Sequence, residues 1–170
     1  MIYIGIGANL PHSVHGPPVG TCEAALRALE EKGIVIASRS RWYRSAPVPP
    51  SDQPWFVNGV AQVVTALAPA RLLEVLHEVE ADFGRVRGAV NAPRILDLDL
   101  LDFHGLVSEA GTTPVLPHPR LAARAFVLLP LRELAPEWRH PESGLSLDRL
   151  IEALPPDQVA RPIDDPAGAA

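Results

Sequence analysis

Apolar residues recur along the chain with two different spacings, and these spacings predict strands and helices in alternation. Four stretches rich in aliphatic and β-branched residues are expected to form strands: residues 1–7, 34–43, 56–67 and 96–103. Apolar positions three or four residues apart predict helices over residues 21–32, 69–84 and 126–134. The order of the first elements, β-α-β-β-α-β, predicts an α+β fold of the ferredoxin-like type, in which helices pack on an antiparallel sheet.

Local signals mark the ends of the two longer predicted helices. Thr21 can cap the start of the first helix, and Gly33 can end it. Pro69 stands in the first turn of the second helix, where proline is well tolerated. The apolar stripe of this second helix is expected to face the core, whereas His77 and Glu80, three residues apart, share another face.

Segments that contain proline and glycine or other turn residues separate these elements and predict loops. Residues 9–20 form the first loop, residues 46–54 the second and residues 88–93 the third. The second loop is long enough to act as a lid or a binding loop. Because the end of the chain is rich in proline, aspartate and alanine, we expect one domain over residues 1–154 and a flexible tail over residues 155–170.

Composition limits the classes of function that fit the chain. Its 170 residues suit one domain with a core of its own, and the net charge of −5 argues against a nucleic-acid-binding protein. No apolar stretch approaches the ~20 residues that a membrane-spanning helix needs, and the N-terminus lacks the features of a signal peptide. Cys22 is the only cysteine, and its apolar helical position favours a buried hydrophobe over a nucleophile. We therefore expect a cytoplasmic protein that binds neither nucleic acid nor membrane.

Asp97 and Asp99 are the first candidates for chemistry. In a strand, residues i and i+2 point to the same face, so both carboxylates are expected to project together while the neighbouring leucines face the other way. Two adjacent carboxylates repel each other unless a cation lies between them, and oxygen ligands of this kind suit Mg²⁺. A solvated strand face is the simpler alternative, because Asp-x-Asp by itself is a weak signal.

Arginines near this pair favour a phosphate ligand. Arg94 precedes Asp97 by three residues, and Arg85 and Arg87 flank the same loop. Guanidinium groups bind phosphate oxygens through paired hydrogen bonds, and carboxylates for Mg²⁺ beside arginines are the groups that phosphoryl transfer requires. The same arginines could form surface salt bridges with acidic neighbours, so composition alone leaves both interpretations open.

Other candidates lie further along the chain and around the second loop. His118 stands between two prolines and could contact phosphate or act as an acid, and Arg120 and Arg124 form a second local cluster of arginines. Beside the loop, a flat heterocycle could stack on Phe56 while Asn58 offers a hydrogen-bond donor and acceptors. Structural roles compete in each case, because a lone histidine is more often structural and the other two could be ordinary strand residues.

Several motifs in a fixed order match a known family. The most specific are Arg-Ile-Leu-Asp-Leu-Asp at residues 94–99 and Pro-His-Pro-Arg at residues 117–120. Further matching stretches are residues 3–10, 43–47, 52–58, 80–87 and 124–128. With these motifs the chain resembles the 6-hydroxymethyl-7,8-dihydropterin pyrophosphokinases of folate biosynthesis. The resemblance implies a ferredoxin-like fold and transfer of the β,γ-diphosphate of ATP to the hydroxymethyl oxygen of the pterin, with AMP as the second product.

The resemblance also implies roles for individual residues. Asp97 and Asp99 would hold two Mg²⁺ ions that bridge to the ATP phosphates, and Asp97 is a candidate for helping to deprotonate the hydroxyl. Arg85 and Arg94 would take part in catalysis on a mobile loop. The pterin edge would be bound by Asn58 and the backbone of Ser45, Ala46 and Val48, and its ring would lie between Phe56 and Phe126. ATP would be bound by His77, Glu80, Arg87, Arg94, His118 and Arg124.

The loop before Arg94 departs from the pattern of the family. Many members carry Arg-Trp in the loop before Arg94, whereas residues 88–92 read one residue shorter and contain neither. Closure over the site is therefore expected to differ.

Two alternative functions are a non-catalytic ferredoxin-like module that binds a nucleotide or pterin, and an RNA-binding domain. The aspartate pair argues against the first, and the charge of −5 argues against the second. We expect a monomer whose partners are small-molecule substrates.

Overall fold

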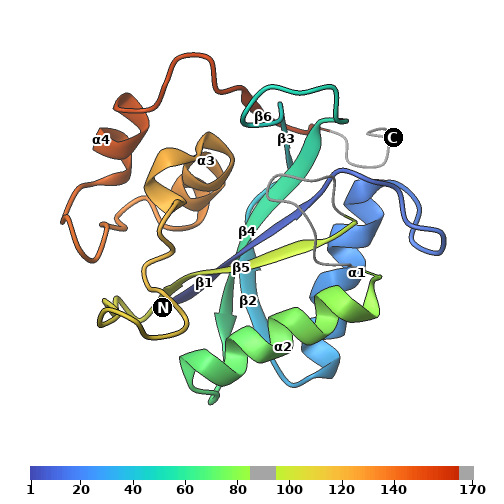
Figure 1. Cartoon of the computed structure of the whole chain (residues 1–170), viewed down its shortest axis with the longest axis horizontal. Coiled ribbons are helices and arrows are strands. Elements are labelled where there is room, and N and C mark those ends of the chain that lie inside the picture. Colours follow the sequence, from blue (N-terminus) through green and yellow to red (C-terminus); the bar gives the residue numbers. More distant parts are fainter. Residues whose placement is uncertain (85–94, 165–170) are drawn as a thin grey trace.

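An antiparallel sheet forms the centre of the molecule, with helices packed on both of its faces (Figure 1). The computed structural model describes residues 1–84 and 95–164. Within these residues the strands are β1 (Ile2–Ala8), β2 (Val35–Arg39), β3 (Tyr43–Ser45), β4 (Phe56–Val64), β5 (Asp97–Phe103) and β6 (Ala160–Pro162). The helices are α1 (Pro18–Glu31), α2 (Pro69–Asp82), α3 (Ala125–Leu134) and α4 (Leu147–Glu152), with a 3₁₀ turn at Leu121–Ala123. The strand order is β5-β1-β4-β3-β6, and β2 also pairs with β4.

The predicted α+β fold is confirmed. The elements β1-α1-β2-β4-α2-β5 follow one another along the chain, and β1 lies between β4 and β5 with antiparallel pairing on both sides. Because β2 also pairs antiparallel with β4, these elements reproduce the βαββαβ plan. The element boundaries differ from the predicted ones by a few residues at most ends.

One predicted strand, residues 34–43, is divided into β2 and β3. The division lies at Ser40, whose hydroxyl accepts a hydrogen bond from the Val60 N–H at 3.0 Å. Just beyond it, the Trp42 ring is fully buried over Gly59, where an added Cβ would lie 2.7 Å from the ring. The chain must leave the regular ladder to bring this large ring into the core, so one continuous strand is impossible here.

The predicted start of α1 is also wrong. The helix begins at Pro18 and not after Thr21. Proline is favoured at the first helical position, where its missing N–H leaves no hydrogen bond unmade. Thr21 is therefore inside the helix, where its N–H donates to the Pro17 carbonyl at 3.3 Å. Gly33 ends the helix as predicted, with a φ of +86° that glycine adopts without strain.

The two faces of the sheet pack against different helices. Isoleucines of β1 at positions 2, 4 and 6 join α1 and α2 in the larger core. On the opposite face, Tyr3, Val60 and Leu101 pack with α3 and α4 in a second cluster. Burying one isoleucine side chain contributes about 1.5–3 kcal/mol. The first face has the larger cluster of buried apolar residues, so it holds most of the stabilising contacts. The second cluster covers only part of its face, and the site described below lies on the rest.

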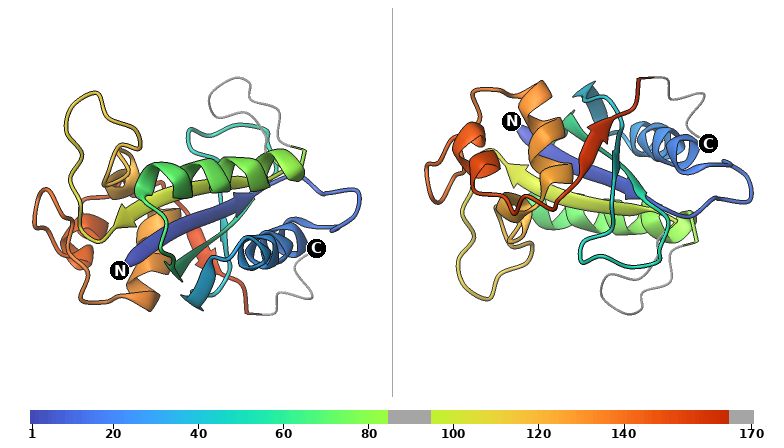
Figure 2. Two further views of the ribbon diagram at one scale, coloured as in Figure 1. Left: turned by 90° about the horizontal axis from the view of Figure 1, so that it is seen from below. Right: turned by 90° about the horizontal axis from the view of Figure 1, so that it is seen from above.

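Part of the segment predicted as a flexible tail, residues 155–170, contributes a strand to the sheet. Residues 160–162 form β6, which pairs with β3 and runs beside α3 (Figure 2, right). The Gln158 side chain accepts a hydrogen bond from the Ala125 N–H and donates one to the Ala123 carbonyl, each at 2.8 Å. These bonds hold the start of α3. The proline-rich composition hid this role because β6 gains its stability from pairing rather than from local sequence. Residues 165–170 lie outside the described part.

Two expectations from composition can be compared with the fold. Cys22 is fully buried in the larger core, and burial raises the pKa of its thiol, as expected for a structural cysteine. None of the helices within residues 1–84 and 95–164 has the length and apolar character needed to cross a bilayer.

A polar cluster joins β3 to α3 and gives the fold a specific pH dependence. The Tyr43 hydroxyl donates to the Glu133 carboxylate, and the Arg41 backbone N–H donates to it at 3.2 Å. Burial acts to raise the pKa of the Glu133 carboxyl, but the hydrogen bonds from Tyr43 and Arg41 outweigh it and hold this pKa below its usual value. The cluster therefore stabilises the fold above the unfolded-state pKa of about 4.3, and that stabilisation is lost as the pH falls through the folded-state value.

We predict that Glu133→Gln lowers the free energy of unfolding at pH 7 by about 1 kcal/mol, a modest value because the carboxylate is partly exposed. As the pH falls through the folded-state pKa the carboxylate gains a proton, so the difference should be smaller at pH 3 than at pH 7. Urea unfolding at both pH values measures this change. Glu152→Gln on exposed α4 serves as the control, and an equal loss at pH 3 and pH 7 would contradict the assignment.

Candidate active site

A row of three residues crosses the centre of the sheet on the face that α3 covers only in part. Asp97 of β5 lies opposite Gly7 of β1, and Gly7 lies opposite Asn58 of β4. The middle residue has no side chain, so open space remains between the carboxylate on one side and the amide on the other. Asp99 lies one pair along, opposite Gly5, which in turn lies opposite Val60 of β4. Both carboxylates point to this face, as the alternation of β5 predicts.

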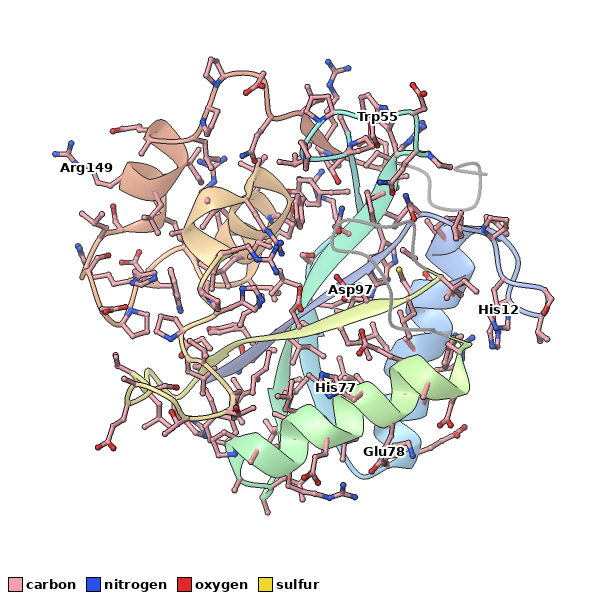
Figure 3. All side chains as sticks on the ribbon, in the orientation of Figure 1. His12, Trp55, His77, Glu78, Asp97 and Arg149 are labelled. Atoms are coloured by element: carbon pink, nitrogen blue, oxygen red, sulfur yellow. The ribbon has the colours of Figure 1, made fainter. Side chains whose placement is uncertain are left out.

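Two pockets meet at the aspartate pair. The first lies over β1 and β4, beneath the loop at residues 46–54, and Val48, Phe56, Asn58, Arg124 and Phe126 are among its lining residues. The second lies between α2, β5 and residues 113–120, and His77, Glu80, Thr113 and Val115 are among its lining residues. Figure 3 shows His77 on the side of α2 that faces β5. Asp97, Asp99, His118 and Arg120 line both pockets, so the pockets share one polar junction.

Cationic and imidazole groups surround the carboxylates at this junction. The Asp99 carboxylate lies 3.7 Å from His118 Nε2 and 3.9 Å from Arg124 Nη1. Burial, with the charges of Arg124 and Arg120, lowers the pKa of His118 to about 4, although Asp97 acts in the opposite direction. The imidazole is therefore neutral at pH 7. Its Nδ1 accepts the Arg120 N–H at 3.2 Å, which leaves the proton on Nε2, facing Asp99.

The position of the aspartates depends on the outer edge of β5. The Leu98 N–H, between the two aspartates, donates to Glu80 Oε2 of α2 at 3.0 Å. Further along the same edge, the His118 N–H donates to the Leu101 carbonyl at 2.9 Å. An edge strand has backbone groups that need partners when they are buried. Glu80 is 2% exposed, so its carboxylate acts as a buried partner that fixes this stretch of β5.

The first pocket combines a fixed amide with aromatic surfaces. Asn58 Nδ2 donates to Ser45 Oγ at 2.6 Å in a buried contact, which fixes the orientation of the amide. Phe56 at the start of β4 and Phe126 in α3 provide the aromatic walls, and the Arg124 guanidinium lies 5.3 Å from the Phe126 ring centre. Asn9, 1% exposed, donates to the Pro54 carbonyl at 3.0 Å and so anchors the proline-rich loop to the end of β1. The loop therefore forms a wall of the pocket, as expected of a binding loop.

The donor set at the junction suits a hard cation that keeps part of its coordination for a ligand. No cluster of three or more His, Cys, Asp or Glu side chains suited to a metal occurs within residues 1–84 and 95–164. Mg²⁺ is usually held by one or two carboxylates, with water and substrate phosphates completing the octahedron. Asp97 and Asp99 fit this role and can bind the ion without further protein ligands.

Comparison with known proteins agrees with this arrangement. The model of the 7,8-dihydro-6-hydroxymethylpterin-pyrophosphokinase family matches residues 3–136, which include both pockets and their junction. The chain belongs to this family. The predicted resemblance is thereby confirmed.

Three relatives of the pyrophosphokinase family carry the name 2-amino-4-hydroxy-6-hydroxymethyldihydropteridine pyrophosphokinase. The protein from Pseudomonas aeruginosa is 41% identical over 161 residues, which is 94% of this chain and 95% of that protein. The protein from Synechocystis is 38% identical over 152 residues, 89% of this chain and 74% of its own length. The protein from Methylorubrum extorquens is 38% identical over 136 residues, 79% and 82% of the two chains.

The structure brings together most of the residues that the resemblance to pyrophosphokinases singles out. Residues at the two pockets and their junction are Val48, Phe56, Asn58, His77, Glu80, Asp97, Asp99, His118, Arg124 and Phe126. Ser45 reaches the first pocket through its bond to Asn58. The Ala46 N–H is not available for a ligand, because it donates to the Val159 carbonyl at 3.1 Å. Arg85, Arg87 and Arg94, with the loop at residues 88–92, lie outside the described residues.

Sequence reasoning missed several residues that shape this site. Gly7 is part of a quoted motif, but its position between Asp97 and Asn58 depends on strand register, which no local pattern reveals. Gln158 lies in the segment that composition predicts to be a tail. Arg120 belongs to a local cluster of arginines for which the sequence gives no specific function. The rigid segment between prolines at residues 117 and 119 was the one signal that could have drawn attention to it.

We predict that Glu80→Ala lowers the free energy of unfolding by about 1–3 kcal/mol, because it leaves the buried Leu98 N–H without its acceptor. Glu80→Gln keeps an acceptor oxygen and should lose less. Urea unfolding measures the stability, and hydrogen exchange at the Leu98 amide measures local opening of β5. Glu78→Ala, on the exposed side of α2 (Figure 3), controls for helix propensity. Unchanged exchange at Leu98 in Glu80→Ala would remove Glu80 as the partner of this edge.

Proposed function

We propose that this protein transfers the β,γ-diphosphate of ATP to the hydroxymethyl group of 6-hydroxymethyl-7,8-dihydropterin in folate biosynthesis, with AMP as the second product. One observation carries the proposal: a pocket suited to a flat heterocycle and a second pocket meet at Asp97 and Asp99. Family membership and the names of the relatives give the substrates their chemical identity.

The first pocket is the proposed pterin site. A pterin is flat and has hydrogen-bond donors and acceptors along one edge. The oriented Asn58 amide and the Val48 backbone suit that edge, whereas Phe56 and Phe126 suit the faces of the ring. The hydroxymethyl group would then point along the row from Asn58 past Gly7 toward Asp97.

The second pocket is the proposed ATP site. His77 and Glu80 line it on the α2 side, and His118 lines the junction, where its Nε2–H can donate to a phosphate oxygen. We assign Arg124 to the same phosphates because it lies 3.9 Å from Asp99. The family motifs alone support Arg87 for ATP binding and Arg85 and Arg94 for catalysis.

Transfer in this arrangement needs positioning and charge stabilisation more than covalent help from the protein. The hydroxymethyl oxygen forms a bond to the β-phosphorus, and the bond from this phosphorus to the bridging oxygen of AMP breaks. The hydroxyl releases its proton to a base, for which Asp97 is the proposed acceptor. Asp97 and Asp99 are the proposed ligands for Mg²⁺, with two ions expected from the family. When bound, the metal would supply charge to the phosphate oxygens. His118 and Arg124 orient the group.

The alternative of a non-catalytic binding module predicts binding of ATP or pterin without turnover. The aspartate pair at the junction favours the enzyme, since binding a heterocycle needs no adjacent carboxylates. The further proposals of a monomer that acts in the cytoplasm, on these small molecules alone, follow from composition and the single cysteine.

The decisive experiment measures AMP and the pterin diphosphate after incubation with ATP, Mg²⁺ and the hydroxymethyl pterin. We expect AMP without ADP, and loss of product when Mg²⁺ is chelated. Asp97→Asn keeps the shape of the side chain but removes its charge, so kcat should fall by about 10²–10³-fold or more. Asp148→Asn on exposed α4 is the matched control. Binding of both substrates without AMP formation in the wild type would establish the binding module instead.

We also predict that Gly7→Ala weakens pterin binding selectively. An added Cβ would lie 2.7 Å from Asn58 Oδ1, so the amide must move away from its bond to Ser45. We expect a rise in the pterin Kd of about tenfold, corresponding to the loss of about one hydrogen bond. Gly5→Ala is the control on the same face of β1, since its Cβ would meet only Leu101 at 3.6 Å. Titration calorimetry with the pterin measures both variants, and equal affinities would rule out this role for Gly7.

A further inference from the structure

Arg120 is the member of the junction that has no function in the scheme above. It lines both pockets, together with Asp97, Asp99 and His118. Its charge also reaches the imidazole, because Arg120 is one of the groups that lower the pKa of His118. The guanidinium is therefore close to the place where the pockets meet.

The backbone of Arg120 is fixed, whereas its side chain is left exposed. The Arg120 N–H donates to His118 Nδ1, and its carbonyl accepts the Ala123 N–H, each at 3.2 Å. Pro119 precedes it and restricts the chain further. Among the described residues no ion pair or hydrogen bond involves the guanidinium. Arg124 differs, because it is 18% exposed and lies 3.9 Å from Asp99.

A guanidinium held this way has its full set of donors available for an anion that enters the junction. The transferred diphosphate must occupy the junction, because its donor lies in one pocket and its acceptor in the other. Before transfer the group belongs to ATP, and afterwards it belongs to the pterin, whose ring remains in the first pocket. A cation that lines both pockets can contact the same phosphates in both states, unlike a residue of one pocket alone.

We propose that Arg120 is a catalytic residue that binds the diphosphate while it passes from ATP to the pterin and holds it on the product. The inference rests on the proposed function. It assigns Arg120 to the phosphates and not to the pterin ring or the adenosine, because the residue lies at the junction and not at the far end of either pocket.

The test compares the affinities of two ligands that differ only by the diphosphate. Titration calorimetry in Mg²⁺ gives the Kd of 6-hydroxymethyl-pterin and of its diphosphate for the wild type, Arg120→Ala and Arg120→Lys. We expect Arg120→Ala to bind the pterin within twofold of the wild type, and to bind the diphosphate about tenfold or more weakly. Arg120→Lys should recover part of this loss, because it keeps the charge but not the paired geometry. In the assay, kcat of Arg120→Ala should fall about 10²-fold while the KM for the pterin stays within twofold.

The control is Arg149→Ala, which removes an exposed arginine far from Asp97 (Figure 3) and should change neither affinity. If Arg120→Ala binds the diphosphate as the wild type does, or loses affinity for both ligands equally, the proposal is overturned. A wild type that binds both ligands but forms no AMP would refute the proposed function, while the comparison of the two affinities would still decide the role of Arg120.

Discussion

The difference between the two faces of β1 determines where everything else in the molecule lies. Its isoleucines pack under α1 and α2, and burial of that face holds the strand in the middle of the sheet. The other face carries Gly5 and Gly7 beside the aspartates of β5. A larger residue at position 7 would occupy the space between Asp97 and Asn58. One strand therefore supplies the stability of the core and the open floor of the site, and neither can shift register without loss of the other.

The aspartates need a rigid edge strand because two carboxylates on one face repel each other and would otherwise move apart. Glu80 holds the backbone between them from the side of α2, and the His118 N–H holds the same edge three residues further on, at Leu101. The supports come from segments that also line the second pocket. A ligand in that pocket therefore contacts the residues that position the aspartates. The Gln158 side chain supports the first pocket in a similar way. It bonds the backbone on both sides of Arg124 and so fixes the position of this lining residue.

Local pattern was sufficient for the strands and helices of the βαββαβ core and for the face on which the aspartates lie, because strand alternation and helical spacing depend on neighbours in sequence. The motifs identified most of the side chains that meet at the junction. Features that depend on pairing across the sheet cannot be predicted from local sequence pattern. The break before Trp42 follows from space over Gly59, and β6 follows from pairing with β3. The bond from the Ala46 N–H to Val159 likewise joins segments that no sequence pattern connects.

The side chains at the junction differ in charge and can therefore act on a phosphate in different ways. His118 is neutral at pH 7, because burial and two arginines oppose its protonation. It can therefore orient a phosphate oxygen through Nε2–H but cannot neutralise its charge. Compensation of a phosphate's charge must come from the arginines, of which Arg124 already lies beside Asp99, and from any cation that the aspartates hold. A diphosphate that enters the junction would bring negative charge close to two carboxylates, and a divalent cation held by Asp97 and Asp99 would weaken this repulsion. A phosphate-bearing substrate and a cation held by the aspartates would therefore bind the junction cooperatively, because without the cation the two carboxylates oppose an anion there.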